Sequence, residues 1–450
     1  MDEIKKAQII ASIIKDNNTI TLTTKSKDGK VWTTKVFYGE KDAGIYVILE
    51  KDGHTLNNIL EDNQVFFVIE KGDPLAFIQG EGVAEVLGKA SELEERSFVT
   101  RKNFQIIPFL RANRDAYLVK INITKVWVSY FYEGWIPRFE VTIDESFKKL
   151  LSEEMSKTSK LPIIIQSTRP WALPATVAAV VFGTLLSPTI DILRFSLAFL
   201  GAVLVHLGVN AFSDYMDYKK GADKWYTLGS SRTIIEGLIK PKEVLILGIS
   251  LISLSLLIGV FILYLTNFNK ILLYLILAGG ALGVFYAFVP IGWKYIGLGD
   301  IAVLLAWTGI SFGSYFVQTL TLNTNIIIAS LPLSLLIVAI LHANNMRDID
   351  DDKSAGYFTL ASLLGKNLSK YYYLILVLSA YLLLIYNVIV ETIPTWSLLA
   401  LLSIPIAYRN ITWAFKDNYV QKGMLDLFTA NLVSRFSLLL ISGIVVSRIV

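Results

Sequence analysis

The sequence predicts a two-domain protein in which a mainly-β barrel is followed by an all-α membrane bundle of nine transmembrane helices. Three observations support this fold class. Only 18% of the 450 residues are charged and 53% are hydrophobic, whereas soluble globular chains are about 25% charged. The apolar excess begins near residue 170, after which long apolar runs alternate with short polar loops. Before residue 160, short stretches alternate between polar and apolar residues, which is typical of strands.

The first domain, residues 1–145, is predicted to contain six short strands. Each stretch is rich in Val, Ile, Thr, Tyr or Phe, and turn signals containing Gly or Asp separate them. Strands of this number and length predict a small closed barrel. Helices are expected over 90–103 and near 54–62. The predicted strands are 18–26, 30–39, 43–51, 64–72, 76–88 and 116–131.

A connecting segment, residues 146–168, follows the barrel. Its charged and apolar residues alternate at helical spacing, which predicts an amphipathic helix and a linker that lie at the membrane surface. The membrane domain then extends over residues 169–450.

The membrane domain contains nine apolar segments. A helix needs about 20 apolar residues to cross a hydrocarbon layer of about 30 Å. The first segment is short and the eighth contains Arg409, so these two are the weakest. The predicted spans are 172–187, 189–212, 243–266, 270–289, 298–320, 324–345, 370–391, 394–414 and 426–448.

Loop charges predict the orientation of the spans. The even-numbered loops contain fourteen Lys and Arg residues, whereas the odd-numbered loops contain one, Lys270, with Arg448 in the C-terminal tail. Basic residues are retained on the inner side during insertion. We therefore expect a cell-membrane protein with a cytoplasmic N-terminal domain and, after nine spans, an external C-terminus.

Composition excludes several classes of function. The chain has no cysteine, so disulfides, thiolate metal sites and cysteine nucleophiles are excluded. A net charge of +4 is too small to indicate a nucleic-acid partner. The charged N-terminus lacks the apolar core of a signal peptide. The expected surroundings are therefore a lipid bilayer, with no nucleic acid.

Two aspartate clusters repeat one spacing at the ends of the second and sixth spans. Asn210 precedes Asp214 by four residues and Asp217 follows by three. The second cluster repeats this spacing with Asn344, Asp348 and Asp351. Such spacings bring side chains to one helix face. Because the clusters lie four spans apart, we expect an internal duplication with a site between the halves.

The clusters predict a site for Mg²⁺ and a diphosphate. Neighbouring carboxylates repel one another unless they share a cation, and ligands that are all oxygen favour Mg²⁺. Interleaved basic residues would bind the diphosphate. The alternative is two ordinary solvated loops whose acids balance their bases. The basic residues in question are Lys219, Lys220, Arg232 and Arg347.

The motifs, span count and span order resemble the UbiA superfamily of prenyltransferases. That family has an NDxxDxxxD-like motif after the second helix and DxxxD after the sixth. Asp214 and Asp217 match the first motif, with Asp223 as its third aspartate after a longer gap, and Asp348 and Asp352 match the second. Ser213 replaces the second asparagine. The resemblance implies that these five aspartates bind metal, that Asp214, Asp217, Asp348 and Asp352 are catalytic, and that diphosphate binding also involves Asn210, Asn344 and Lys294.

Several segments resemble the 1,4-dihydroxy-2-naphthoate branch of that family, among them RPWALPATVAAVVFGTLL, DYMDYKKGAD and YIGLGD. The branch implies transfer of a polyprenyl group from its diphosphate to an aromatic quinone precursor in menaquinone synthesis. Alternatives are 4-hydroxybenzoate, homogentisate or a glycerol-phosphate lipid as acceptor. A transporter with a soluble sensor domain is disfavoured, because its aspartates would lie near mid-span. Lys294 and Asp300 fall where the family has a third polar contribution, or act as an anchor and a helix N-terminal acid.

The first domain resembles the flavin-binding split barrel of the pyridoxamine-phosphate-oxidase-like family. The segments TLTTKSKDGKVWTTKVFY, HTLNNILEDNQVFFVI and IQGEGVAEV carry this resemblance. It implies that Thr33, Thr34, Lys35 and His54 approach the phosphate of FMN, although His54 stands where the family often has Lys or Arg. The alternative is a barrel without flavin that serves dimerisation or regulation.

Overall fold

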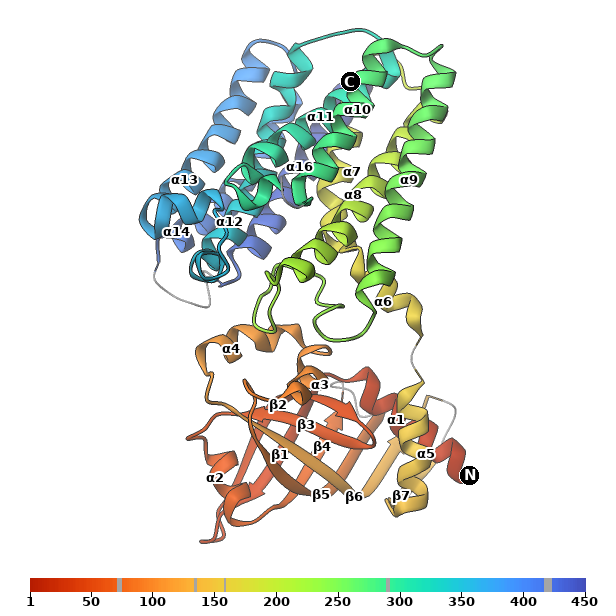
Figure 1. The fold of residues 1–450 in the computed structure, drawn as a ribbon, viewed down its shortest axis with the longest axis vertical. Helices are drawn as coiled ribbons and strands as arrows, with labels where there is room; N and C mark the ends of the chain where they lie inside the picture. The colour runs from red at the N-terminus through yellow and green to blue at the C-terminus, as the bar shows by residue number, and fades with distance from the viewer. Residues whose placement is uncertain (71–74, 133–135, 158, 289–291, 417–422) are drawn as a thin grey trace. The chain divides into compact units, whose positions relative to one another are not determined.

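The chain folds into two compact units, Met1–Lys160 and Leu161–Val450, in a computed structural model that describes residues 1–70, 75–132, 136–157, 159–288, 292–416 and 423–450. We call them the β unit and the helical unit. This division differs from the predicted one, because the helix that begins the predicted linker belongs to the β unit (Figure 1).

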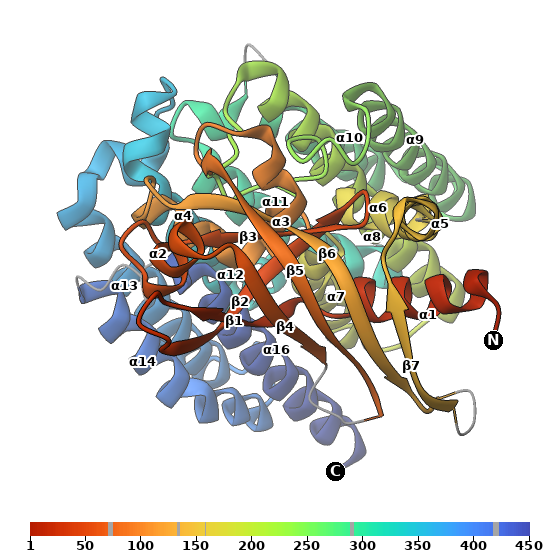
Figure 2. The same cartoon turned by 90° about the horizontal axis from the view of Figure 1, so that it is seen from below.

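Six strands of the β unit close into the predicted barrel, and a seventh extends it. The order is β3-β2-β1-β4-β5-β6, and a pairing between β3 and β6 closes the ring. The seventh strand, β7, pairs with the second half of β6 and was not predicted (Figure 2). The strands are β1 Thr19–Lys25, β2 Val31–Lys41, β3 Gly44–Leu49, β4 Gln64–Glu70, β5 Ala76–Lys89, β6 Tyr117–Tyr130 and β7 Ile136–Thr142.

Alternating side chains fill the barrel. In β1, Ile20 and Leu22 are fully buried, whereas the alternating Thr19, Thr21 and Thr23 are half-buried. Side chains of this period point to opposite faces of a strand, so one apolar set forms the core. The helix predicted over 90–103 is a 3₁₀ turn and a single helical turn instead. The other elements are α1 Glu3–Asp16, α2 His54–Glu61, η1 Glu94–Arg96, α3 Ser97–Thr100, η2 Phe104–Ile106 and α4 Ile107–Ala112.

The helix expected at the membrane surface instead packs onto the barrel core. α5, Glu145–Ser156, buries Phe147, Leu151 and Met155 in the same apolar cluster as α1. The prediction was wrong for α5, because its apolar face is already covered by protein. It remains a prediction for α6, Lys160–Ser167, whose Leu161 and Ile165 are exposed.

The helical unit contains eight described helices that are long and apolar enough to span a membrane. The first predicted span forms only the shorter helix α7, Leu173–Leu185, after the 3₁₀ turn η3 at Pro170–Ala172, so the count of nine stays a prediction. The long helices are α8 Ile192–Lys220, α9 Pro241–Leu265, α10 Lys270–Ala287, α11 Gly299–Thr319, α12 Asn325–Ser354, α13 Leu360–Ile389, the pair η5 Thr395–Ser403 with α14 Ile404–Phe415, and α16 Leu425–Ile449.

Close helix contacts position the two motif-bearing helices, α8 and α12. Gly208 of α8 faces Gly248 of α9, and a Cβ on Gly208 would lie 3.0 Å from the Gly248 carbonyl oxygen. The absence of a side chain therefore permits the two backbones to approach. α12 lies in the main apolar cluster with Leu336 and Ala339 fully buried.

Two details bear on the predicted orientation. Lys422, one of the fourteen basic loop residues, lies outside the described residues. Arg194 lies at the start of α8, where its Nη1 donates to the carbonyl oxygens of Val317 and Gln318 at the end of α11. It adds one basic residue to the side that has few, so the predicted asymmetry is reduced but keeps its sign.

Candidate active site

The first aspartate motif forms the last turns of α8. Gly221 ends the helix in the left-handed conformation, φ 71°, and the Ala222 N–H donates to the Asp217 carbonyl oxygen at 2.9 Å. This glycine-dependent end is a common helix stop. It leaves Asp214 and Asp217 one turn apart on the helix, both buried.

Asp214 is bound by groups from two distant segments. Its Oδ1 accepts from the guanidinium of Arg169, just before η3, and its Oδ2 accepts from the Ser231 backbone N–H at 2.9 Å. Asp214 is 1% exposed. A buried carboxylate is stable only when it is paired in this way.

Asp217 faces the 3₁₀ turn η4, Trp293–Tyr295. Its Oδ2 accepts from Lys294 Nζ at 2.6 Å and its Oδ1 accepts from the Tyr295 hydroxyl at 2.7 Å. Lys294 Nζ also donates to Ser213 Oγ at 2.6 Å. Ser213, which departs from the family motif, therefore helps to position the lysine beside Asp217.

Asp223 is a third carboxyl group near Asp214 and Asp217. Burial, and then the neighbouring carboxylates of Asp217 and Asp214, raise its pKa to about 7. Its carboxylate accepts no hydrogen bond from the residues that the structure describes. A cation bound beside Asp223 would lower that pKa and favour the ionised carboxylate.

The second motif carries its own counter-charge. Arg347 donates to both carboxylate oxygens of Asp348, at 3.0 and 2.7 Å, and to Asp426 of α16 at 2.6 Å. The same guanidinium contacts the Asn344 side-chain oxygen. Asp352 accepts from the Thr359 hydroxyl at 3.2 Å. Arg347 is thus fully engaged with protein groups.

Two close approaches link the segments that carry the two motifs. A Cβ on Gly229, in the loop after the first motif, would lie 3.9 Å from Asn344 Nδ2. Tyr357, which follows the second motif, stacks on Tyr295 with 5.0 Å between ring centroids. The Tyr295 hydroxyl in turn donates to Asp217.

Of the remaining predicted diphosphate ligands, Lys219, Lys220 and Asn210 lie on α8 with the first motif, whereas Arg232 is bonded to other protein groups. Lys220 Nζ lies 3.8 Å from the ring centroid of Tyr295, near the site, and Lys219 is exposed at the same helix end. Asn210 Nδ2 donates to the Thr168 carbonyl oxygen at 3.2 Å. Arg232 differs from the expectation. It pairs with Glu236 and donates to the carbonyl oxygen of Trp225 at 2.7 Å, so it shapes the loop.

Sequence reasoning missed three residues of the site and left one open. Arg169 and Tyr295 are tied to the first motif through tertiary contacts, whereas Tyr357 follows the second motif and stacks on Tyr295. Arg169 lies in the RPWALP segment and Tyr295 begins the YIGLGD segment, but no spacing marked either tyrosine as a site residue. Asp300 is buried and its Oδ2 lies 3.1 Å from His342 Nδ1, while His342 Nε2 lies 3.1 Å from the Ser369 carbonyl oxygen. This pair joins α11 to α12.

The donor set fits Mg²⁺ in its chemistry. The acidic groups around Asp217 and Asp223 supply only oxygen atoms, which Mg²⁺ prefers. No three acidic or histidine side chains among the described residues form a preformed metal cage. Mg²⁺ commonly uses one or two carboxylates and takes further ligands from water and substrate phosphates. The arrangement fits a site that a diphosphate completes.

The four residues expected near FMN do not converge. Thr33 and Lys35 lie on the outer face of β2, and Thr33 Oγ1 lies 3.0 Å from Thr23 Oγ1 of β1. Thr34 pairs with the buried Leu22 and points the other way. His54 contacts Trp32, which lies on the same face of β2 as Thr34, with 4.5 Å between ring centroids.

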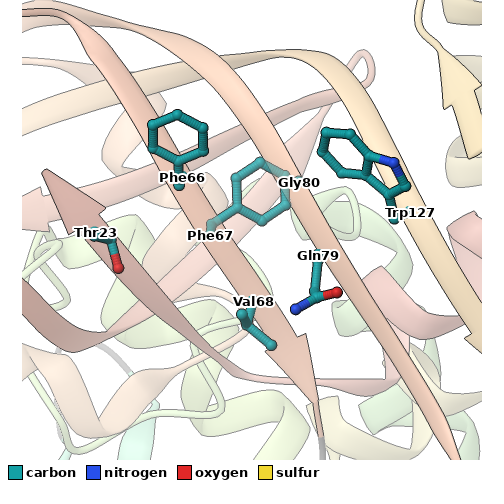
Figure 3. Close-up of a pocket in the computed structure, with 7 residues that line it drawn as sticks. All are labelled: Thr23, Phe66, Phe67, Val68, Gln79, Gly80 and Trp127. Carbon is teal, nitrogen blue, oxygen red and sulfur yellow. The ribbon is translucent and has the colours of Figure 1, made fainter.

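The outer face of the barrel has a shallow cavity of about 310 Å³. Figure 3 shows Phe66 of β4 and Trp127 of β6 beside it, with Gln79 of β5 between these strands. Thr23, the partner of Thr33, also lines it. Aromatic walls beside hydroxyl groups suit a flat ligand with polar edges, so only Thr33 and Lys35 of the expected set lie on a suitable face.

Two family models match the chain. The model of the UbiA prenyltransferase family matches residues 172–432, and the model of pyridoxamine 5'-phosphate oxidase matches residues 7–130.

Individual relatives match the helical unit. UbiA prenyltransferase domain-containing protein 1 of Danio rerio is 33% identical over 256 residues, which cover 56% of this chain and 75% of that protein. The 1,4-dihydroxy-2-naphthoate octaprenyltransferase of Bacillus subtilis is 29% identical over 302 residues, which cover 65% of this chain and 94% of that protein. A solved structure of a UbiA homologue from Archaeoglobus fulgidus bound to GPP and Mg²⁺ has a TM-score of 0.44 at 16% identity, covering 62% of this chain and 99% of the other.

Proposed function

The chain belongs to the UbiA prenyltransferase family and is a membrane-embedded transferase, and from this premise we propose that it transfers a polyprenyl group from an allylic diphosphate to 1,4-dihydroxy-2-naphthoate or a close aromatic relative. The acceptor is supported by the similarity to the Bacillus subtilis enzyme, which extends over 94% of that protein. The product would be a precursor of menaquinone.

The observation that carries the reaction type is the first motif. Asp214 and Asp217 are buried beside Arg169 and Lys294, while Asp223 has a raised pKa beside them. Mg²⁺, when bound by Asp214, Asp217, Asp223, Asp348 and Asp352, would supply positive charge that stabilises the departing diphosphate. Arg169 and Lys294 provide fixed N–H donors for the same group, with Lys219, Lys220, Asn210 and Asn344 around it.

The helical unit would protect the reaction from water. When the allylic C–O bond breaks, the prenyl fragment becomes an electron-poor carbon that water would capture. The interior beside the motifs is apolar, with Phe182 and Tyr373 fully buried in the main cluster. Such a lining leaves the aromatic ring as the available nucleophile. The diphosphate leaves with the electrons of the C–O bond, and the ring carbon that forms the new C–C bond releases its carboxylate as CO₂.

Purified full-length protein tests this function. Geranylgeranyl diphosphate is supplied with 1,4-dihydroxy-2-naphthoate, 4-hydroxybenzoate, homogentisate or a glycerol-phosphate lipid, and products are identified by mass spectrometry. We expect a prenylated naphthoquinol product that disappears with EDTA and returns with Mg²⁺. Preference for another acceptor would keep the family and overturn the branch. Mass spectrometry of lipids from cells that lack the chain would identify the physiological product.

For the β unit we propose FMN as a ligand on the outer face, where Thr33 pairs with Thr23 of the aromatic cavity and Lys35 lies on the same face of β2. The support is the match of residues 7–130 to the pyridoxamine 5'-phosphate oxidase model. Protein that purifies yellow, or that takes up added FMN with a change in flavin fluorescence, would support the ligand. Colourless protein that takes up no FMN would leave dimerisation or regulation as the role of this unit.

We also propose nine spans, a cytoplasmic β unit and an external C-terminus. The support is the excess of basic residues in loops on one side. Reporters fused before Met1 and after Val450 test this arrangement, and we expect them to report opposite sides. Reports from the same side would mean that the spans are miscounted, at the short first segment, which forms α7, or at the eighth, which contains Arg409.

A further inference from the structure

Tyr357 occupies the segment between α12 and α13, three residues after the second motif helix ends. Its backbone N–H donates to the Asp352 carbonyl oxygen at 2.8 Å. The next N–H, of Phe358, donates to the Tyr295 carbonyl oxygen at 3.1 Å. The backbone around Tyr357 is therefore tied both to the second motif and to η4, which faces the first.

The ring of Tyr357 is fixed as firmly as its backbone. It stacks on the Tyr295 ring at 5.0 Å with 28° between the planes. Lys220 Nζ lies 3.8 Å from the Tyr295 ring centroid and 4.6 Å from that of Tyr357. An ammonium group over two aromatic rings is attracted to both, so Lys220 holds the stack on the side of the first motif.

The two hydroxyl groups of this stack differ. The Tyr295 hydroxyl donates to Asp217 at 2.7 Å. The Tyr357 hydroxyl oxygen is buried and has no hydrogen-bond partner in the part of the chain that the structure describes, and the residue is 5% exposed. A buried polar group without a partner is costly, so each one requires an explanation.

The surroundings of the Tyr357 hydroxyl indicate what it would bind. The carboxylates of Asp217, Asp223 and Asp352 lie near this phenol. The ordinary pKa of a tyrosine is about 10, so the hydroxyl carries its proton near neutral pH and acts as a donor. Carboxylates from both motifs are therefore near it, yet none accepts its proton. The vacant acceptor position lies where the two motifs approach each other.

We propose that the hydroxyl of Tyr357 donates a hydrogen bond to the diphosphate of the prenyl donor. This inference rests on the proposed function and adds a binding residue that neither aspartate motif contains. An anionic oxygen is the acceptor that suits a neutral donor beside the ammonium group of Lys220. The aromatic acceptor, in contrast, would lie toward the apolar interior and would not contact this hydroxyl.

The Tyr357→Phe variant tests the hydroxyl alone, because it keeps the stack on Tyr295 and the contact with Lys220. The variant loses a hydrogen bond to a charged group, and this loss should raise the KM for geranylgeranyl diphosphate about 10-fold. The inhibition constant of inorganic pyrophosphate should rise by the same factor. The KM for the aromatic acceptor and the inhibition by geranylgeraniol, which has no diphosphate, should stay within about 2-fold.

Tyr381→Phe is the matched control. Its hydroxyl lies 2.6 Å from Ser403 Oγ, between helices away from the motifs. We expect this variant to keep both KM values, although it also loses a buried tyrosine hydroxyl. A loss of diphosphate affinity in the control would attribute the effect to general loosening of the helices and would overturn the proposal.

The other outcomes separate this inference from the function beneath it. Wild-type protein that transfers no prenyl group from any allylic diphosphate refutes the proposed function itself. Active wild type with an unchanged pyrophosphate constant in Tyr357→Phe refutes the inference alone. If Tyr357→Phe fails to fold, Tyr357→His decides, because it restores a ring N–H donor. It should bind pyrophosphate within about 3-fold of wild type, and a loss of about 10-fold or more would overturn the proposal.

Discussion

The two units bury charge in opposite ways. In the β unit, Lys102 Nζ donates to Glu40 at 2.6 Å and to the Ile14 carbonyl oxygen at 2.6 Å, so one cation meets one anion. In the helical unit, Asp214, Asp217 and Asp223 lie together beside Arg169 and Lys294. The first arrangement is closed, whereas the second has an excess of negative charge.

This difference teaches where to look for a ligand. A closed pair is neutral and needs nothing from solution, although burial raises the pKa of Glu40 and lowers that of Lys102. A crowd of carboxylates keeps one member, Asp223, partly protonated near neutral pH until a cation arrives. Buried charge in the β unit therefore stabilises the fold, and buried charge at the first motif serves binding.

The largest expected effect is a loss of stability on replacement of Arg347. This residue is the shared ion-pair partner of Asp348 and Asp426 within the helical unit. Arg347→Met would leave Asp348 and Asp426 without their shared partner, and a broken buried pair costs about 3–5 kcal/mol. We expect a large drop in the thermal midpoint, measured by tryptophan fluorescence in detergent.

The double variant Arg347→Met/Asp426→Asn is the control, because it removes one of the stranded charges. It should regain part of the lost stability. A single variant as stable as wild type would show that Arg347 does not act as a structural counter-charge, and that it remains available for diphosphate.

Neutralising the motif carboxylates should abolish prenyl transfer without unfolding the protein. Asp214→Asn, Asp217→Asn and Asp348→Asn should each lower prenyl transfer at least ~100-fold, as loss of one strong electrostatic contributor does. Rates with saturating Mg²⁺ give the measurement, and thermal midpoints check the fold.

Asp350→Asn is the matched control within the second cluster. Asp350 is exposed and pairs with Lys366 at 2.6 Å on the surface. We expect its rate to stay within about 2-fold, since exposed pairs contribute little. Equal losses of transfer rate in Asp350→Asn and Asp217→Asn would contradict the idea that only the buried motif carboxylates serve the reaction.

The sequence predicted those parts of the site and fold that depend on local pattern. Alternation located the six barrel strands, and spacing located Asp214, Asp217 and Asp348 at two helix ends. β7 was missed although it is as long as β1 and β4, because its segment IPRFEVT contains a proline and two charged residues that weaken the strand pattern. α5 was misplaced because an amphipathic pattern does not say whether lipid or protein covers the apolar face.

Partners chosen by tertiary contact were beyond such patterns. Arg232 and Arg347 both lie near a motif in sequence, yet the structure commits both to protein carboxylates. Arg169 and Tyr295 come from distant segments and contact the first motif directly. Proximity in the chain therefore identified the anions of this site better than its donors.

The closed pair of the β unit should matter for stability alone. Lys102→Met leaves Glu40 buried without its partner, and we expect a loss of about 1–3 kcal/mol in urea unfolding of this unit. Prenyl transfer by the full chain should not change. Lys125→Met is the control. Lys125 pairs with Glu140 at 2.5 Å on the exposed face, where the expected loss is below about 1 kcal/mol.

The smallest effect on stability is expected from Asp144, an exposed helix-capping carboxylate that belongs to neither the buried pair of the β unit nor the buried carboxylates of the helical unit. Asp144 caps α5 by accepting the Phe147 N–H at 2.8 Å, and this bond, followed by one from the Ser146 hydroxyl, lowers the pKa of Asp144. A carboxylate with a lowered folded pKa stabilises the protein above its unfolded pKa, and this contribution is lost as pH falls through the folded value. Asp144→Ala should therefore lower the stability of the β unit slightly near neutral pH and should match wild type well below pH ~3.9.

The measurement requires the β unit alone, and we predict that residues 1–158 fold independently because Phe147 and Leu151 of α5 complete the barrel core. A fragment that ends at residue 145 would lack this helix and should unfold at lower urea concentration. Lys149→Ala, an exposed change on the same helix, controls for altered helix propensity. If Asp144→Ala stays less stable than wild type by the same amount at low pH, the cap does not act through its charge. The small effect expected at the exposed helix cap, compared with the buried pair and the buried carboxylates of the first motif, would then need another physical explanation.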